Sequence, residues 1–221
     1  MREVVLDTET TGLDPEAGHR IVEVACIELA NHLPTGRSFH RYVNPERSVP
    51  DDAIKVHGLT DVFLAQHALF AAVADELVAF IAEGPLVAHN AEFDLGFLNA
   101  ELRRLERPPL ACHAIDTLAL ARRRFPGSPA SLDALCRRYG IDLSAREKHG
   151  ASLDCELLAA VYLELVGGRQ PGLDLAAGTA SSRQSVVQRP VRIPRPHAPT
   201  DAERAAHEKF LDKITAPIWR Q

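Results

Sequence analysis

The sequence has no long apolar run and no recognisable export signal. No stretch approaches the roughly 18 uninterrupted apolar residues that mark a membrane helix, so we expect no membrane span. The first strand is predicted directly after Met1, without the charged region, apolar segment and cleavage site of a signal peptide. We therefore expect a cytoplasmic protein.

Cysteine is scarce, with four residues in a chain of 221. Cys26, Cys112, Cys136 and Cys155 form no Cys-x-x-Cys pair, and each lies in an apolar run. This spacing argues against a zinc site or a disulfide framework. It favours buried free thiols in a reducing compartment.

An excess of positive charge is also missing, because the formal net charge is −5 and the pI is about 6.1. Proteins that hold nucleic acid by their own electrostatic field are usually basic. If this chain acts on nucleic acid, it should bind weakly alone and be delivered by another component. With 46% hydrophobic and 25% charged residues, it otherwise has the balance of an ordinary globular protein.

Apolar periodicity and turn residues predict an α/β domain over residues 1–166. The expected strands are 4–9, 20–29, 38–43, 85–88 and 113–115, and polar loops between the first three predict an antiparallel meander. The expected helices are 68–82, 90–104 with Asn90 as N-cap, one from about 116, 131–140 with Ser131 as N-cap, and 152–165. This order predicts a mixed sheet with helices on its faces.

The composition changes after the domain. Residues 167–199 are rich in proline, glycine and arginine and lack periodicity, which predicts a disordered linker. In residues 200–221, Thr200 and Glu203 predict a capping box at the start of a short helix. An isolated helix of this length is marginal in water, so we expect it to dock on a partner; the alternative is that it folds back onto its own domain.

Two acidic residues share one face of the first predicted strand. Because side chains alternate along a strand, Asp7 and Glu9 point the same way, with Cα atoms roughly 6.6 Å apart. The preceding Val4-Val5-Leu6 indicates a buried strand, where carboxylates are costly unless a cation offsets them. Mg²⁺ or Mn²⁺ would do so, since hard cations prefer oxygen ligands.

Two further acids stand at predicted helix starts. Asp94 falls in the first turn of its helix, where the helix dipole favours an anion, although ordinary helix-start acids lie there too. Asp154 opens the last helix of the domain, and His149 precedes it in a loop beside Gly150. A lone loop histidine usually faces solvent, but this one stands five residues before an otherwise unexplained aspartate.

Asp7, Glu9, Asp94, Asp154 and His149 resemble, in order and context, the catalytic set of the DEDDh exonucleases, which share a ribonuclease H-like fold. The resemblance covers about residues 4–166 and includes the segments Val56-His57-Gly58-Leu59 and Ser131-Leu132-Asp133-Ala134-Leu135-Cys136. Within that family, the motifs look most like those of bacterial DNA polymerase III epsilon subunits, which proofread new DNA from its 3′ end.

The resemblance implies a role for each residue. Asp7, Glu9 and Asp154 would hold two divalent cations, Mg²⁺ or Mn²⁺, with Asp94 contributing directly or through water, and His149 would be the general base. It also implies that Asp7, Glu9, Asp154, Asp52 and His57 contact the terminal nucleotide and that Thr10, Asn90 and Phe93 line its pocket.

The C-terminal segments imply partners. The apolar positions Phe210, Leu211 and Ile214, followed by Trp219, are similar to the polymerase-binding segment of the epsilon family, whose partner is the alpha subunit. Gln170, Leu173 and Leu175 fit the Gln-x-x-Leu-x-Leu pattern of sliding-clamp ligands, a short match that arises easily by chance. We expect a monomer that works inside a hetero-oligomer, where tethering compensates for weak DNA binding.

Other functions stay open at this stage. The same site chemistry would serve an exonuclease that acts on RNA or in DNA repair, although the C-terminal segment argues against this. A non-catalytic replisome scaffold is a second alternative, but all five catalytic positions carry the expected residue types. The sequence has no P-loop, zinc spacing or Ser-His-Asp arrangement that would indicate unrelated hydrolase chemistry.

Overall fold

The computed structural model describes residues 1–82, 84–146, 148–168, 198–215 and 217–218. The chain divides into two compact units, Met1–Leu173 and Asp174–Gln221, and each is described by itself. No helix among the described residues is long and apolar enough to span a membrane.

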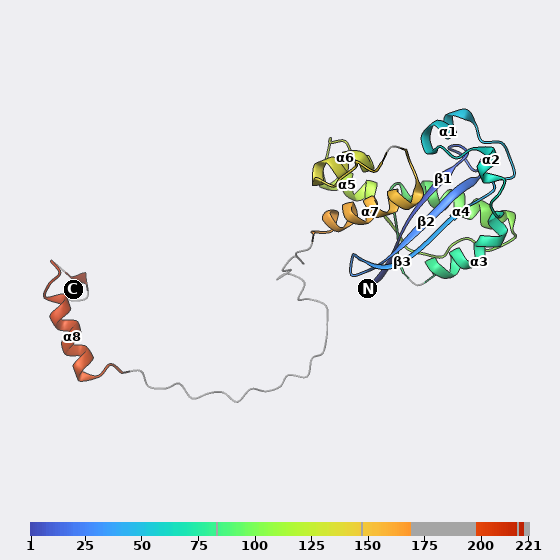
Figure 1. The fold of residues 1–221 in the computed structure, drawn as a ribbon. Helices are drawn as coiled ribbons and strands as arrows, with labels where there is room; N and C mark the ends of the chain where they lie inside the picture. The colour runs from blue at the N-terminus through green and yellow to red at the C-terminus, as the bar shows by residue number, and fades with distance from the viewer. Residues whose placement is uncertain (83, 147, 169–197, 216, 219–221) are drawn as a thin grey trace, which may run out of the picture. The chain divides into compact units, whose positions relative to one another are not determined.

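The first unit is built on a five-stranded mixed sheet. The strands are β1 (Arg2–Thr10), β2 (Ile21–Ala30), β3 (Leu33–Tyr42), β4 (Leu86–Ala88) and β5 (Ala114–Asp116), in the spatial order β3-β2-β1-β4-β5. Figure 1 labels the first three. The first three pair antiparallel, whereas β4 pairs parallel with both β1 and β5. The predicted meander and mixed α/β fold are therefore confirmed, and β1 lies in the middle of the sheet.

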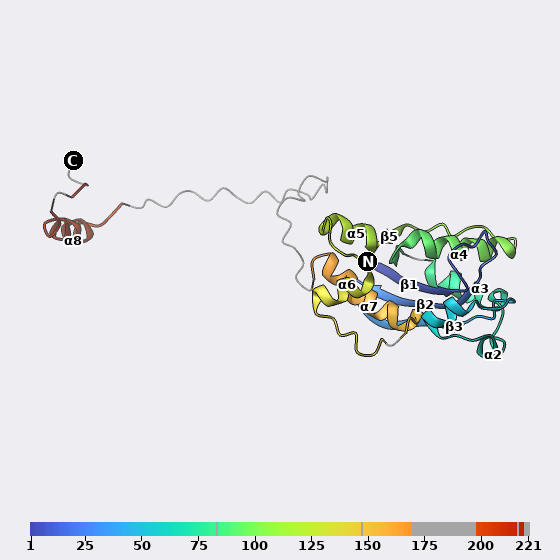
Figure 2. The same ribbon diagram turned by 90° about the horizontal axis from the view of Figure 1, so that it is seen from above.

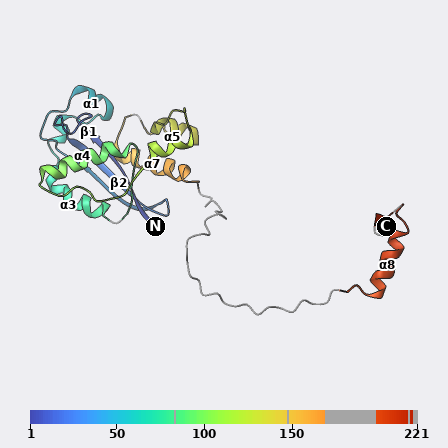
Figure 3. The same cartoon turned by 180° about the vertical axis from the view of Figure 1, so that it is seen from behind.

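Helices cover both faces of the sheet. In chain order they are α1 (Asp51–His57), α2 (Asp61–Leu64), α3 (Phe70–Ile81), α4 (Ala91–Arg104), α5 (Thr117–Arg124), α6 (Leu132–Tyr139) and α7 (Ala151–Leu165). Seen from above, α4 and α7 lie on opposite sides of β1 and β2 (Figure 2). From behind, α3 and α4 stand on the viewer's side (Figure 3).

Alternation along β1 divides the core into two clusters. Val4 and Leu6 pack with α3 and α4, through residues such as Phe97. Val5 points to the other face, where it packs with α7 through residues such as Leu158. Because Asp7 and Glu9 continue the series of Val5, they face α7, whereas Thr8 faces α4.

Some local predictions need correction. Strand β3 begins at Leu33, five residues before its predicted start. Its first half is an exposed edge with turn-like composition, so the sequence pattern did not indicate a strand there. Asn90 occupies the N-cap position of α4 but has a left-handed backbone (φ 74°), and its side chain makes no capping hydrogen bond. Ser131 does cap α6 by accepting a hydrogen bond from the Ala134 amide. Cys112 is only half-buried, although the other three free cysteines are buried as expected.

Two helices lie between β3 and α3, in a segment for which we predicted neither a helix nor a strand. Helix α1 follows Pro50 and ends at Gly58, whose φ of 80° is the left-handed conformation that glycine adopts without strain. Helix α2 follows after three residues and is capped by Thr60. Residues of α1 line a cavity together with the end of β1, and α2 lies next to α1 (Figure 1).

The second unit contains helix α8 (Asp201–Leu211). The predicted capping box is present, because Thr200 Oγ1 accepts from the Glu203 amide and the Glu203 carboxylate accepts from the Thr200 amide. The helix ends three residues before Ile214, Leu211 is buried, and Phe210 is 59% exposed. Most of the predicted linker, the clamp-like residues 170–175 and Trp219 lie outside the described residues.

Candidate active site

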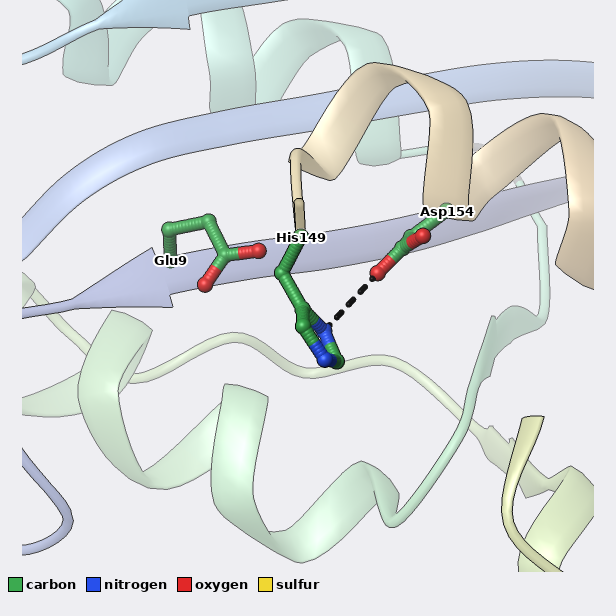
Figure 4. Close-up of side chains that lie close together, drawn as sticks. All are labelled: Glu9, His149 and Asp154. Atoms are coloured by element: carbon green, nitrogen blue, oxygen red, sulfur yellow. Dashed lines mark ion pairs between the residues drawn. The ribbon is translucent and has the colours of Figure 1, made fainter. Parts of the chain in front are cut away.

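Three of the predicted catalytic side chains meet where β1 approaches the start of α7. The ligand atoms of Glu9, His149 and Asp154 all lie within 4.8 Å of one another. Figure 4 shows Glu9 reaching from the strand toward the His149 ring, while Asp154 approaches from the helix. The His149 Nδ1 atom lies 3.3 Å from Asp154 Oδ2. Residues separated by 140 positions thus form one polar cluster.

Asp94 reaches the same region from the opposite helical layer. It is buried in the first turn of α4 and accepts a 2.7 Å hydrogen bond from the hydroxyl of Thr8, the residue between Asp7 and Glu9. This hydrogen bond links the first turn of α4 to β1 at the position between Asp7 and Glu9.

Burial and mutual repulsion raise the pKa values of these acids. Burial is the largest cause for Glu9, and with the negative charges of Asp154 and Glu23 it raises the Glu9 pKa to about 8. Burial likewise raises the pKa of Asp94 to about 7, against the lowering effect of the Thr8 hydrogen bond. The pKa of Asp7 is raised well above its usual range by burial and by Asp94, Glu9 and Asp154.

Such an arrangement fits divalent cations. A group of buried carboxylates with raised pKa values is under-compensated by the protein, and bound positive charge would stabilise their ionised forms. All four acids offer oxygen, the donor that Mg²⁺ and Mn²⁺ prefer.

The sequence analysis missed Arg146, whose side chain is 8% exposed. Its guanidinium donates to both carboxylate oxygens of Asp154, each at 2.6 Å, and its Nη2 lies 2.8 Å from His149 Nδ1. It also pairs with Asp133. Arg146 therefore orients the aspartate and the histidine together, and its place three residues before His149 was the only signal in the sequence.

Glu23 was missed as well. It lies opposite Glu9 in the β1–β2 pairing, is 3% exposed, and has its Oε1 atom 2.6 Å from His40 Nε2. Its negative charge contributes to the raised pKa of Glu9. An acid near the start of a largely apolar strand was the available signal.

A cavity of about 550 Å³ opens beside Glu9. Of the residues expected at the terminal nucleotide, Thr10, Asp52, His57 and Phe93 line it. His57 is buried, its Nδ1 atom accepts a hydrogen bond from the Leu59 amide, and its Nε2 atom has no hydrogen-bond partner among the described residues. Asn90 is exposed and lies outside the lining, and its amide donates to Asp116.

A second cavity, of about 540 Å³, borders the other acids of the cluster. Its lining includes Asp7, His149 and Asp154 together with Arg146 and Arg122. A larger cavity of about 600 Å³, bordered by Pro108 and Cys112, contains none of the predicted catalytic acids. The predicted site is therefore the place where the first two cavities meet the acids.

Comparisons with known proteins agree with this geometry. The sequence model of the family described as Exonuclease matches residues 4–162. The DNA polymerase III subunit epsilon of Rickettsia felis is 45% identical over 222 residues, covering 97% of each chain. The Escherichia coli subunit of the same name is 43% identical over 236 residues, covering 99% of this chain and 97% of that protein. The chain belongs to the DNA polymerase III epsilon family.

Solved structures match the exonuclease unit. Exonuclease X in complex with 5′-overhanging duplex DNA has a TM-score of 0.60 and 25% identity, covering 74% of this chain and 90% of that one. The nuclease domain of 3′hExo, a DEDDh family member bound to rAMP, has a TM-score of 0.63 and 23% identity, covering 77% and 94%, and it supports the fold. With this membership, the chain is a 3′→5′ proofreading exonuclease of a family that depends on divalent metal.

Proposed function

We propose that this chain removes mispaired 3′-terminal nucleotides from DNA by hydrolysing the last phosphodiester, as a subunit of a replicative polymerase complex. The observation that carries the proposal is the cluster of Glu9, Asp154 and His149, with Asp7 and Asp94 contributing to its electrostatics. Relatives that are named epsilon subunits along nearly their whole length support the complex.

In this proposal, Asp7, Glu9 and Asp154 hold two divalent ions, Mg²⁺ or Mn²⁺, and Asp94 contributes directly or through water. When bound, such ions lower the pKa of a water molecule and offset the charge that develops on the phosphate. His149 is half-exposed in a loop, so it can take the proton from the attacking water and pass it to solvent.

Arg146 positions this base. Because its guanidinium contacts both Asp154 and His149, it keeps the imidazole beside the acids. The terminal nucleoside would lie in the cavity beside Glu9, between Phe93 and His57, with Thr10 and Asp52 at its edge. Mispaired ends fray at lower cost than paired ends, so a site that takes a single-stranded end selects them before chemistry.

The partner assignments belong to the same proposal. Phe210, exposed on α8, with Leu211, Ile214 and Trp219 would bind the polymerase alpha subunit, and Gln170, Leu173 and Leu175 would contact the sliding clamp. The proposed division is an exonuclease domain at 1–166, a linker at 167–199 and a polymerase-binding segment at 200–221. The chain would act in the cytoplasm as a monomer within that assembly.

The test is degradation of a 5′-labelled single-stranded DNA oligonucleotide with Mg²⁺, beside a matched duplex, a duplex with a mispaired 3′ end and an RNA of the same sequence. We expect a ladder of shortening DNA products that EDTA abolishes, with the paired end degraded most slowly. Preference for RNA would move the chain to the ribonuclease alternative. Absence of any cleavage would favour the scaffold alternative.

A further inference from the structure

The two cavities that meet at the acids differ in chemistry. The lining of the cavity beside Glu9 includes apolar side chains such as Leu13, Val56 and Phe93 together with the acids Glu9, Asp14 and Asp52, and none of its lining residues is arginine or lysine. This composition suits a base and a sugar. The second cavity, defined by Asp7, His89, Leu118, Arg122, Ser131, Leu132, Asp133, Arg146, His149 and Asp154, contains two arginines.

Only one of these two arginines is available to a ligand. Arg146 is almost fully buried and committed to Asp154 and Asp133. Arg122 is exposed and forms no ion pair within the described part of the chain. Burial lowers the pKa of His89, and the positive charge of the nearby Arg122 also lowers it. The His89 imidazole is therefore mostly neutral at pH 7 and adds little positive charge to the cavity. The free cation of this cavity is therefore Arg122.

A DNA strand, which is a polyanion, needs a cation such as Arg122 to bind beside these acids. The chain carries a net charge of −5, and the acids concentrate negative charge where a strand must pass. With the terminal nucleoside in the first cavity, the second cavity, which borders Asp7 and Asp154, offers a path for the upstream strand. Phosphates on that path gain most from a guanidinium without a competing acidic partner.

The neighbouring arginines of α5 make this assignment specific. Arg124 donates to the backbone carbonyls of Glu164 and Leu165, so it attaches α5 to the end of α7. Arg123 is exposed and lies outside the lining of both cavities. Of these three consecutive arginines, only Arg122 lines the cavity that also contains Asp7 and Asp154.

We propose that the second cavity binds the DNA strand on the 5′ side of the scissile bond and that Arg122 contacts the first internucleotide phosphate upstream of that bond. This inference deepens the proposed function and rests on it. Arg122 is a substrate-binding residue: it anchors the strand without touching the bond that breaks.

The experiment compares the full-length wild type with Arg122→Gln, using Arg123→Gln as the matched control. One substrate is a single-stranded oligonucleotide, and the other is the p-nitrophenyl ester of thymidine 5′-monophosphate, which has no upstream phosphate. We expect Arg122→Gln to raise KM for the oligonucleotide about 5–10-fold, with kcat nearly unchanged and a weaker dependence of KM on salt. Hydrolysis of the ester should be the same in all three proteins.

A substrate with a neutral methylphosphonate at the first upstream linkage locates the contact. In the wild type and in Arg123→Gln it should raise KM by a similar factor, whereas Arg122→Gln should show no further loss. An unchanged oligonucleotide KM in Arg122→Gln, or equal loss on the ester, would overturn the inference. A wild type that cleaves neither substrate would instead refute the proposed function, so the two failures are distinguishable.

Discussion

Both ends of one face of β1 place acidic side chains against α7, but the surroundings of these acids differ. At one end, Glu3 is fully buried but accepts hydrogen bonds from the Tyr162 hydroxyl at 2.6 Å and from the His32 amide at 3.2 Å. At the other end, Asp7 and Glu9 face further carboxylates and have raised pKa values. A buried acid alone therefore does not mark a functional site; a group of buried acids that the protein leaves under-compensated does.

The largest effect should come from the catalytic end. Asp7→Asn removes a proposed metal ligand, so we expect exonuclease activity to fall by at least about 10³-fold. The reason is that the carboxylates that hold the metal ions act as a unit, so the loss of one disables the set. The same change removes repulsion in the metal-free protein, so its midpoint of thermal unfolding in EDTA should rise. A loss of both activity and metal-free stability would contradict the idea that this end is strained by its own charge.

His149→Gln should separate chemistry from architecture. Loss of a general base typically costs about 10²–10⁴-fold in turnover. Because the ring is half-exposed, the fold should be unaffected, and Mn²⁺ binding measured by electron paramagnetic resonance should be little changed. Unfolding of this variant under conditions where the parent is stable would refute the assignment.

At the Glu3 end of β1, Glu3→Gln should lower the free energy of unfolding by about 1–3 kcal/mol. The buried Tyr162 hydroxyl then loses its charged hydrogen-bond acceptor. Specific activity of the folded protein should stay near that of the parent. The control is Glu76→Gln, because the ion pair of Glu76 with Arg41 is exposed and contributes little. Equal destabilisation by the two variants in urea titrations would remove the contrast between the ends of β1.

Much of this contrast was accessible from the sequence. Alternation along a strand requires Asp7 and Glu9 to share a face, and helix-start patterns locate Asp94 and Asp154. Arg146 could not be recognised, because its contacts depend on how a loop folds back onto α7. Glu23 became visible only with the register that places it opposite Glu9. The left-handed backbone of Asn90 was not predicted either, although asparagine is one of the residues that adopt this conformation most readily.

The pH dependence of metal-free stability gives the most direct test of the comparison. A carboxyl group whose pKa is higher in the folded state binds more protons there, so its contribution to stability is present at low pH and is lost as the pH rises. For Glu9 the window runs from about 4.5 to about 8, with a slope of up to roughly 1.4 kcal/mol per pH unit.

The EDTA-treated protein should therefore unfold at a lower temperature at pH 8 than at pH 5.5, and Glu9→Gln should reduce this drop. Glu3→Gln lowers stability by a different route and should leave the pH-dependent drop in place. Saturating Mg²⁺ should remove much of the drop, because bound cations stabilise the ionised acids in the folded state. A metal-free protein that becomes more stable between pH 5.5 and 8 would mean that the acids beside His149 are compensated by the protein after all, like Glu3 at the other end of the strand.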